Sequence, residues 1–563
     1  MLCNDPKTFR EDMLKGYVLA NRNYVVEVPG GVARATETPK GKVAVINGGG
    51  SGHYPAFCGI IGSGFMDATV VGNVFTSPSA DDVYHVAKAV ESGSGVFIIG
   101  GNYAGDKMNF NLARDRLIAE GIDARSFYIT DDVASGSKEE IEKRRGNVGT
   151  FIVFKIAGAA STEGYSFDQI VNVTDKANKN TRTMSIGLKG CTMPGALGPL
   201  FHVPVGKMEV GQGIHGEPGV FESDLVSASE IAELLVTKVL EEAPDNAGKK
   251  IGVILDGLGS TKYEELFVVW KSVAELLDKH GFVLVEPQVG EFVTSLDMAG
   301  IALSIIFLDE ELEMFWKAPA DTPAFKKGVV RTEIGIQRKV FMQDDSITYK
   351  EGSEDSKKAA KVIVESFRRM KNAIIEAEEE LARIDSVAGD GDHGRGMVKG
   401  LTYAYEAAKE ACDAGAGAGS VLCAAGNEWA AKAGGTSGVL WGEFLKAAGN
   451  VIGDDSEIYD TGLIADALSN GIKKIQELGN AKLGDKTMLD TLIPFAESFN
   501  KAARQKMNIT DAWKCAAKVA QQAAEKTADM LPKVGRARPQ AERSLGIPDA
   551  GAISMALCIM AVV

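Results

Sequence analysis

The sequence has few of the features that mark membrane or secreted proteins. The apolar run that closes the chain, Met555 to Val563, is too short to cross a bilayer. The first residues lack the apolar core of a signal peptide. The 7 cysteines form no C-x-x-C pair and are odd in number, which favours free thiols in a reducing compartment. We therefore expect a cytoplasmic protein with no membrane partner.

Positive charge is also in short supply. The chain has 61 Lys and Arg against 76 Asp and Glu, a formal net charge of −15. Binding to nucleic acid requires clustered Lys and Arg, so we expect no nucleic-acid partner. An acidic protein can still bind phosphate through a few backbone N–H groups and a metal ion. Small-molecule substrates fit this composition better.

No repeat with a period of 20–50 residues recurs, which argues against a solenoid. From Lys42 to about Pro319, apolar strand-like runs alternate with helical segments, which predicts an α/β region with mixed or parallel sheets. Later segments are Ala-rich with helical spacing, which predicts an all-α region. We place the domains at 1–338 and 357–563. A polar linker at 339–356 separates them.

The common phosphate-binding loops are missing. No Walker loop and no G-x-G-x-x-G fingerprint are present. Instead, a strand-like run ends in GGGSGH, residues 48–53, where α/β proteins bind ligands. His53, with a pKa near neutrality, could take a proton from a substrate hydroxyl. A single histidine at such a place is equally compatible with a structural role.

Two more loops carry candidate catalytic side chains. Asp106 follows a second strand-like run, in the segment Asn102-Tyr103-Ala104-Gly105-Asp106. His215 is flanked by glycines in GQGIHGEPG, residues 211–219. Ordinary turns produce such patterns too. If the loops converge, His53, Asp106 and His215 would supply a base, an orienting carboxylate and a nucleophile.

The strongest local pattern is an acidic loop in the second half. Asp385, Asp390 and Asp392 lie within eight residues of one another, among glycines that disfavour a regular helix. A divalent cation would relieve their repulsion, and all-oxygen ligands suit Mg²⁺ or Ca²⁺. An EF-hand is excluded because position 12 from Asp390 is Leu401. The alternative is a solvated acidic loop.

Small and polar residues also stand at the edges of several predicted helices. The segments are GGTSG at 434–438, GDKTM at 484–488, GRAR at 535–538 and PDAGA at 548–552. Helix N-termini favour anions. Thr436 and Ser437 could donate to phosphate while Arg536 adds charge. Each segment taken singly is also typical of caps and turns.

These motifs together resemble the dihydroxyacetone kinase family in its single-chain, ATP-dependent form, over almost the full length. GGGSGH, FTSPS at 75–79, NYAGD at 102–106, GCTMPG at 190–195 and GIHGEPG at 213–219 resemble the family's substrate domain. GDGDHG at 389–394, GGTSG, GDKTM and ERS at 542–544 resemble its nucleotide domain.

The resemblance implies roles for the residues of the first domain. His215 would add to the substrate carbonyl and form a covalent hemiaminal, which selects ketoses over polyols. His53 would act as general base on a terminal hydroxyl, aided by Asp106. The substrate-binding residues implied are Gly50, Ser51, Gly52, His53, Asn102, Tyr103, Asp106 and His215.

For the second domain, the resemblance implies an antiparallel barrel of helices that binds ATP. Asp385, Asp390 and Asp392 would hold two Mg²⁺ ions on the ATP phosphates. The nucleotide-binding residues implied are His393, Gly394, Arg395, Gly396, Thr436, Ser437, Gly479, Met488, Arg536, Asp549, Ala550 and Gly551. The resemblance also implies a homodimer in which a partner can complete the site.

The sequence departs from the family pattern near the sugar. Gly101 stands where the family often has Lys, and Tyr54 and Phe57 replace polar residues after His53. We expect extra room beside Gly101 and aromatic walls from Tyr54 and Phe57. The first interpretation is a kinase for a ketose of the dihydroxyacetone type, with a four-carbon ketose such as erythrulose as the alternative. A non-catalytic ketose sensor and a phosphotransfer protein fed by a phosphorylated carrier are alternatives of other classes.

Overall fold

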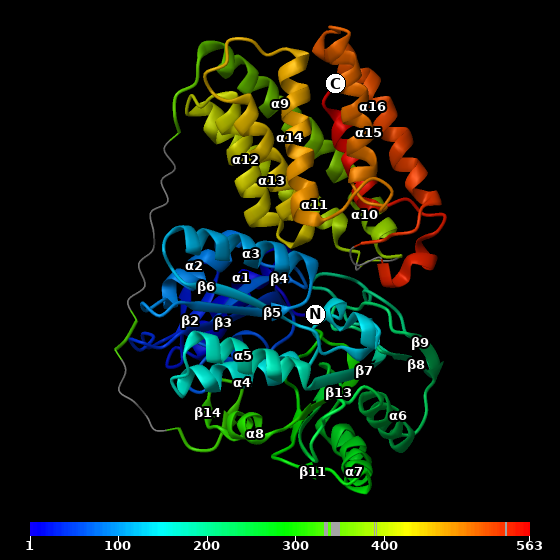
Figure 1. Cartoon of the computed structure of the whole chain (residues 1–563). Coiled ribbons are helices and arrows are strands. Elements are labelled where there is room, and N and C mark those ends of the chain that lie inside the picture. The colour runs from blue at the N-terminus through cyan, green and yellow to red at the C-terminus, as the bar shows by residue number, and fades with distance from the viewer. Residues whose placement is uncertain (331–335, 339–348, 388, 390, 535–537) are drawn as a thin grey trace. The chain divides into compact units, whose positions relative to one another are not determined.

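The computed structural model describes residues 1–330, 336–338, 349–387, 389, 391–534 and 538–563. The chain forms two compact units, residues 1–342 and 343–563 (Figure 1). The first unit is α/β with two mixed sheets, and the second is all-helical. The predicted fold class is therefore confirmed.

The first sheet has six strands in the order β1-β2-β4-β3-β5-β6. The strands β4, β3, β5 and β6 are parallel, whereas β1 and β2 add an antiparallel edge. Their bounds are β1 Val25–Val28, β2 Gly31–Arg34, β3 Ala44–Ser51, β4 Ala68–Val74, β5 Val96–Gly101 and β6 Ala124–Ile129. Because β3 and β5 are parallel neighbours, the loops that follow them leave from one edge of the sheet.

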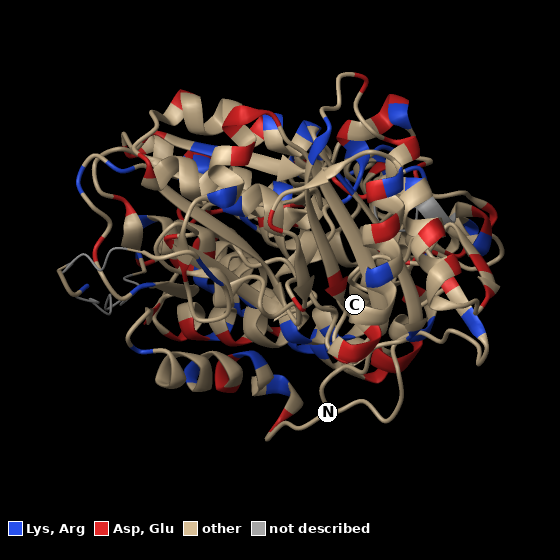
Figure 2. Cartoon of the chain, turned by 90° about the horizontal axis from the view of Figure 1, so that it is seen from below, with Lys and Arg blue, Asp and Glu red and all other residues tan. Residues whose placement is uncertain are grey.

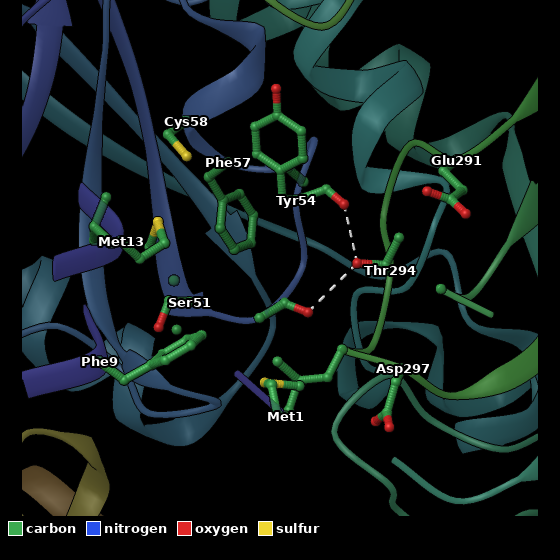
Figure 3. Close-up of a pocket in the computed structure, with 17 residues that line it drawn as sticks. Met1, Phe9, Met13, Ser51, Tyr54, Phe57, Cys58, Glu291, Thr294 and Asp297 are labelled. Carbon is green, nitrogen blue, oxygen red and sulfur yellow. Dashed lines mark hydrogen bonds between the residues drawn. The ribbon is translucent and has the colours of Figure 1, made fainter. Parts of the chain in front are cut away.

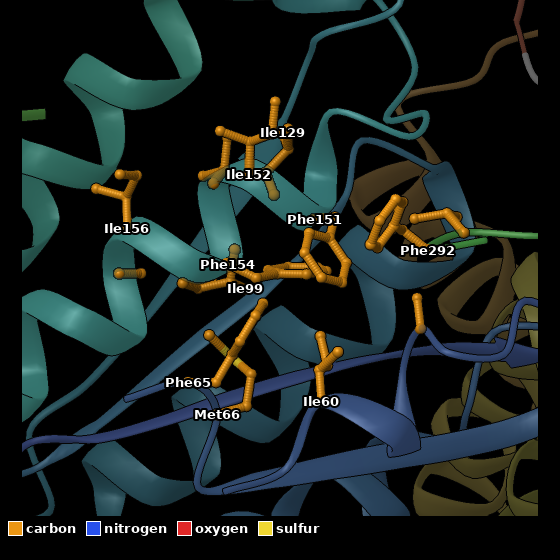
Figure 4. Close-up of a cluster of buried hydrophobic side chains, with 14 of the residues drawn as sticks. Ile60, Phe65, Met66, Ile99, Ile129, Phe151, Ile152, Phe154, Ile156 and Phe292 are labelled. Atoms are coloured by element: carbon orange, nitrogen blue, oxygen red, sulfur yellow. The ribbon is translucent and has the colours of Figure 1, made fainter. Parts of the chain in front are cut away.

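Helices cover both faces of this sheet. The helices are α1 Phe9–Ala20, α2 Ala80–Val90, α3 Ala104–Ala119, α4 Thr150–Thr162 and α5 Phe167–Lys179. In Figure 1, α2 and α3 lie on one side of the strands and α4 and α5 on the other. α4 is buried over almost its whole length, because Phe151 and Phe154 pack with Ile99 and Phe65 (Figure 4). Burial on both sides explains why the strands are continuously apolar.

The second sheet has seven strands in the order β11-β10-β13-β7-β8-β9, with β12 paired to β10. Their bounds are β7 Thr181–Lys189, β8 Lys207–Val210, β9 Phe221–Asp224, β10 Lys250–Gly257, β11 Val283–Leu284, β12 Gln288–Gly290 and β13 Ala299–Phe307. The remaining elements are α6 Ala228–Glu241, α7 Tyr263–Lys279, α8 Glu310–Lys317, β14 Ala320–Asp321 and β15 Lys326–Lys327. α6 and α7 pack side by side on this sheet.

The second unit is a closed ring of helices. Each of the helices from α11 to α17 contacts the next, α17 contacts α9, and α9 contacts α11. The bounds are α9 Glu354–Glu376, α10 Glu378–Asp385, α11 His393–Asp413, α12 Ala418–Ala433, α13 Gly435–Ile452, α14 Thr461–Gly479, α15 Leu489–Arg504, α16 Ile509–Lys526 and α17 Ala550–Ala561. Small residues at the contacts allow the helices to approach closely. The Cα atoms of Gly426 and Gly442, for example, face the carbonyl oxygens of each other's helices.

The predicted linker, residues 339–356, is too long at its C-terminal end. α9 already begins at Glu354, because the Ser353 hydroxyl accepts a hydrogen bond from the N–H of Ser356 at 3.1 Å and caps the helix. Glu351 also pairs with Ala416 of the same unit. Composition alone did not show this cap. Residues 339–348 of the predicted linker lie outside the described residues.

No helix in the described part of the chain is long and apolar enough to span a bilayer. Lys and Arg residues alternate with Asp and Glu along the ribbon (Figure 2). Many of these charges pair within one helix, for example Arg383 with Glu380 and Lys409 with Asp413. Such exposed pairs contribute little to stability, and they leave the acidic balance of the chain unchanged.

Candidate functional site

The two predicted catalytic histidines meet in the first unit. His53 follows β3, and His215 lies in the loop between β8 and β9 of the other sheet. Their imidazole rings are 4.8 Å apart, centroid to centroid, at an angle of 85°. Both side chains are buried. The loops that the sequence singled out therefore converge across the two sheets.

The protonation of the His53 ring follows from its neighbours. Nδ1 donates a hydrogen bond to the carbonyl oxygen of Thr294 at 2.7 Å. A carbonyl can only accept, so Nδ1 carries the hydrogen and Nε2 carries a lone pair. Nε2 is buried and has no hydrogen-bond partner among the described residues. Burial and the neighbouring His215 lower the pKa of His53 to about 3, so the ring is neutral at physiological pH.

Sequence reasoning missed the loop that holds His53. The N–H of Thr294 donates to the carbonyl of His53 at 3.2 Å, and the N–H of Leu296 donates to that of Gly52 at 2.8 Å. Asp256, at the end of β10, accepts from the N–H groups of Phe292 and Val293 and fixes the same loop. These residues lie more than 200 positions from His53, and no local pattern links the two segments.

The ring of His215 is oriented by a carboxylate. Nδ1 lies 3.1 Å from Oε1 of Glu217, and the other carboxylate oxygen accepts from the N–H of His215 at 3.0 Å. An ionised carboxylate only accepts, so Nδ1 carries the hydrogen and the lone pair is on Nε2. An imidazole held in this tautomer presents a lone pair that can act as a nucleophile.

Aromatic side chains surround the two imidazoles. Phe75 stacks on His53 with ring centroids 5.1 Å apart and stands edge-on to His215 at 5.6 Å. Phe57 contacts the His53 ring at 5.9 Å, and Tyr103 contacts the His215 ring at 4.7 Å. The backbone of Phe75 is left-handed, with φ of 57°, an uncommon conformation for a large side chain. Phe57 thus forms the expected aromatic wall.

The expected open space beside Gly101 is absent. A Cβ atom on Gly101 would lie 2.8 Å from a ring carbon of Tyr103, so the tyrosine ring already fills that space. The Tyr103 hydroxyl donates to the carbonyl of Gly146 at 2.8 Å, which holds the ring there. The prediction of extra room was wrong because it considered the missing side chain and not the neighbour that replaces it.

The structure also describes Asn102 and Asp106, the other predicted residues of this loop. Asp106 lies in the first turn of α3 and is buried. The amide nitrogen of Asn102 donates to the carbonyls of Glu142 and Arg144, at 2.9 and 2.8 Å. Both amide hydrogens are therefore used inside the protein, and only the carbonyl oxygen of Asn102 remains to contact a substrate.

A cavity of about 370 Å³ adjoins the glycine loop (Figure 3). Its walls come from α1, from residues 49–58 and from the loop 291–297. Thr294 donates to the carbonyl of Tyr54 at 2.9 Å and to that of Gly52 at 3.4 Å. Tyr54 is 47% exposed and faces this cavity, not the histidine pair. Its ring stands edge-on to that of Tyr17 in α1, with centroids 6.0 Å apart, and the expectation that Tyr54 walls the sugar pocket stays a prediction.

In the second unit, carboxylates gather at the start of two helices. Asp549 caps α17 by accepting from the N–H of Ala552 at 2.7 Å, and Asp385 lies 3.4 Å from the N–H of His393, which begins α11. The His393 Nε2 lies 2.9 Å from the Ser554 hydroxyl and ties the two helices together. Burial and the nearby Asp385 raise the pKa of Asp549 to about 7. The carboxylates thus repel one another.

This donor set fits a hard cation. A divalent ion would relieve the repulsion, and carboxylate oxygens are the ligands that Mg²⁺ prefers. Asp392 occupies the N-cap position of α11, next to this cluster. Asp390 and Arg536 lie outside the described residues. Within the described ranges, no group of three His, Cys, Asp or Glu side chains is already arranged around a point where an ion could sit.

The remaining predicted nucleotide residues mark helix ends of the ring. Gly394, Arg395 and Gly396 form the first turn of α11, and Thr436 and Ser437 that of α13. Gly479 ends α14, Met488 precedes α15, and Ala550 and Gly551 begin α17. A Cβ on Gly551 would lie 3.6 Å from the Met488 nitrogen, and one on Gly479 would lie 3.7 Å from Leu440. Met488 therefore lies beside Gly551, and Gly479 lies beside α13.

Lys486 was not predicted as a site residue. Its ammonium donates to the carbonyls of Met530 and Ser544, at 3.1 and 2.7 Å, and to the Ser544 hydroxyl. It thereby holds the segment that precedes α17. The motif GDKTM contained this lysine, but nothing local showed that its side chain binds backbone.

Comparisons with known proteins match both units. The Dak1 domain model matches residues 15–324 and the DAK2 domain model matches residues 387–563. The chain is 54% identical to a D-erythrulose kinase of Mycolicibacterium smegmatis, covering 99% of this chain and 97% of that protein. It is 45% identical to an L-erythrulose kinase of Pectobacterium atrosepticum, covering 100% and 95%.

Solved structures agree with these matches. The dihydroxyacetone kinase from C. freundii in complex with AMP-PNP and Mg²⁺ is 27% identical, with a TM-score of 0.53, covering 100% of this chain and 98% of that one. A dihydroxyacetone kinase operon co-activator is 32% identical, with a TM-score of 0.53, and covers 56% of this chain and 98% of its own.

Proposed function

The chain belongs to the dihydroxyacetone kinase family and is an ATP-dependent ketose kinase, and we propose that its preferred substrate is a four-carbon ketose such as erythrulose. The observation that carries the chemistry is the pair of buried imidazoles, His53 and His215, with rings 4.8 Å apart. The substrate size rests on the erythrulose kinases of similar sequence. These relatives favour a four-carbon ketose over dihydroxyacetone as the preferred substrate.

His215 would hold the ketose covalently. The Nε2 lone pair of His215 attacks the carbonyl carbon and forms a C–N bond. The C=O π bond breaks, and the carbonyl oxygen becomes a hydroxyl once it is protonated. The net change moves the Nδ1 proton to that oxygen, and Glu217, 3.1 Å from Nδ1, is placed to take the proton on the way. A polyol has no carbonyl and cannot form this bond.

His53 would then accept the hydrogen of the terminal hydroxyl at Nε2. Thr294 fixes the ring so that this nitrogen keeps its lone pair. The pKa of about 3 makes His53 a weak base. A weak base suffices because phosphoryl transfer passes through a loose transition state in which alignment and charge neutralisation contribute most. Asp106, buried in the first turn of α3, would assist in orienting the hydroxyl.

The second unit would bind Mg²⁺ and ATP. Asp385, Asp390 and Asp392 are the proposed metal ligands, with two ions expected. The bound Mg²⁺ neutralises charge on the transferred phosphoryl group. Thr436, Ser437 and the first turns of α11 and α17 offer hydroxyl and N–H donors to an anion. Asp385 and Asp549 would order those turns around it.

Two predicted properties go with this proposal. We propose a homodimer, as the family resemblance implies, and a cytoplasmic location, for which the 7 free cysteines are suitable. A ketose sensor is the competing class, because a co-activator resembles the first unit. The matched second unit, with its carboxylates at the helix starts, favours catalysis.

The test is a substrate panel. The purified protein is incubated with Mg²⁺, ATP and one of the candidate sugars, and ADP release is measured. The sugars are dihydroxyacetone, D- and L-erythrulose and five-carbon ketoses. Glycerol and erythritol serve as matched polyols. We expect turnover of ketoses and none of polyols, with a tetrulose the best substrate. Ketose binding without ADP release would instead support the sensor.

A further inference from the structure

Lys486 is a buried lysine whose ammonium group binds three protein oxygens. The residue is 4% exposed, and Nζ donates to the carbonyls of Met530 and Ser544, at 3.1 and 2.7 Å. The Ser544 hydroxyl accepts a third hydrogen bond from Nζ at 3.1 Å. An ammonium group has three hydrogens and no lone pair, so these bonds use its whole donor capacity. Lys486 therefore has no hydrogen left to donate to a phosphate group in this structure.

The backbone around Lys486 is held in a strained conformation. The carboxyl oxygens of Asp490 accept from the N–H groups of Gly484 and Thr487, at 2.5 and 2.7 Å, and close the loop that carries the lysine. The backbone of Lys486 is left-handed, with φ of 60°, which costs free energy for a residue with a Cβ atom. Such strain persists only where the surrounding structure imposes it, and it clusters at functional segments. The loop therefore dictates where the Lys486 side chain points.

The oxygens bound by this ammonium belong to two chain segments that lead into α17. These segments, which we name the stem, are residues 527–530 and 544–549. The N–H of Gly546 donates to the carbonyl of Ala528 at 2.9 Å and joins the two halves of the stem. The N–H of Asp549 donates to the Thr527 hydroxyl, also at 2.9 Å, and the side chain of Asp549 caps α17. The stem therefore fixes the place where α17 begins.

The loop of Lys486 also reaches the start of α17 through Met488. A Cβ atom on Gly551 would lie 3.6 Å from the nitrogen of Met488 and 3.7 Å from its Cβ atom. Burial lowers the pKa of the Lys486 ammonium, and the side chain of Asp549 acts in the opposite direction, so the lysine lies near the cap of α17. Met488, Asp549 and Gly551 are residues proposed to bind the nucleotide. Lys486 thus ties two parts of that proposed site together.

We propose that Lys486 is a positioning residue for the nucleotide. By binding the stem, it holds the start of α17 against Met488, so that both can contact the same nucleotide. This inference rests on the proposed nucleotide site of the second unit. Lys486 acts through the stem and does not touch the phosphates. A direct contact with phosphate is the usual role of a lysine in a phosphate-binding loop, and the experiment separates the two roles.

The first measurement is amide hydrogen exchange of the full chain without nucleotide, read by mass spectrometry of peptides that cover the stem and the first turn of α17. In Lys486→Met we expect faster exchange there than in the parent, because the ammonium that joins the two halves of the stem is gone. Lys409→Met is the control. It removes an exposed lysine of the same unit, which pairs with Asp413 at 2.6 Å, and it should exchange as the parent does.

The second measurement compares the KM for ATP with the KM for the ketose. In Lys486→Met we expect the KM for ATP to rise by about 10- to 100-fold, because a group that orients binding residues is lost, while the KM for the ketose stays the same. Weaker folding by itself lowers the amount of active enzyme, and thus the apparent kcat, and leaves both KM values unchanged. Lys409→Met should keep both KM values of the parent.

Ser544→Ala is a milder variant that removes one of the three acceptors and leaves the carbonyl of residue 544 in place. It should speed exchange in the stem and raise the KM for ATP by about threefold, the effect of one lost hydrogen bond. If Lys486→Met does not fold, this variant decides the question by the same two measurements.

Two results would overturn the inference. One is an unchanged KM for ATP in the folded variants. The other is a raised KM for ATP in Lys486→Met with exchange in the stem equal to that of the parent, since Lys486 would then contact the nucleotide directly. Failure of the parent to bind ATP would instead overturn the proposed function, and the exchange result would still show whether Lys486 holds the stem.

Discussion

The phenol ring of Tyr103 stands at 88° to the imidazole of His215, with ring centroids 4.7 Å apart. Two glycines make this arrangement possible. Gly101 leaves room for the ring, and a Cβ on Gly146 would lie 2.8 Å from the Cα of Gly101. Tyr103 is therefore a wall beside His215 that only small residues at 101 and 146 permit.

Substitution of Gly101 should displace that wall. In Gly101→Ala the new Cβ would collide with the Tyr103 ring, so we expect the ring to move and kcat/KM for ketoses to fall by about 10-fold or more. Gly16→Ala is the control, since a Cβ there meets nothing within 4 Å. Equal kcat/KM in parent and Gly101→Ala would show that the ring position is unimportant.

Substrate length can be tested directly. We expect kcat/KM for D- or L-erythrulose to equal or exceed that for dihydroxyacetone. One extra hydroxymethyl group is worth only about 1–3 kcal/mol of discrimination, so dihydroxyacetone should remain a usable substrate. Gly101→Lys, which forces Tyr103 aside and adds a cation, should shift the ratio toward the three-carbon sugar. A strong parental preference for dihydroxyacetone would contradict the four-carbon proposal.

The proposed covalent bond between His215 and the ketose can be tested separately. His215→Ala should lose the discrimination between ketoses and polyols, because no other residue in the scheme reacts with a carbonyl. A crystal of the parent soaked with ketose should show continuous density from Nε2 of His215 to the sugar. If His215→Ala still rejects glycerol and erythritol as the parent does, another group must provide the selection.

The proposed metal ligands of the second unit can be tested by substitution. Asp392→Asn and Asp390→Asn should abolish Mg²⁺-dependent ADP release, because each removes a charge that the cation requires. Ketose binding, measured by calorimetry, should persist. Asp413→Asn is the matched control at the far end of α11, where Asp413 is exposed and pairs with Lys409. Unaltered turnover in both variants would exclude a metal role for this loop.

Stability should depend on pH through His53. Its pKa is about 3 in the folded protein, against about 6.5 when unfolded, so the unfolded chain binds more protons between these values. The free energy of unfolding therefore falls as pH falls from about 6.5 toward 3. His53→Gln cannot titrate, so its urea midpoint should fall less than that of the parent between pH 7 and pH 4. Parallel curves would show that His53 is not buried as a neutral ring.

The order of an α/β region followed by an all-helical region could be predicted from the sequence. Strand-like runs that end in glycine, and Ala-rich segments with helical spacing, depend on local periodicity, and both units follow them. The C-terminal end of the linker could not be predicted from such local patterns. The Ser353 cap and the pairing of Glu351 with Ala416 involve contacts that composition does not report.

The amino-acid sequence by itself determined which chemical groups are available: two glycine-flanked histidines, a carboxylate after a strand, and an acidic loop. Only the tertiary structure decided what these groups can do. Thr294 sets the tautomer of His53 from 241 positions away, and His215, in a loop of the second sheet, meets His53, which follows a strand of the first. Tyr103 fills the space that Gly101 leaves. Such contacts depend on strand order and on the packing of distant loops, and no local pattern of residues encodes them.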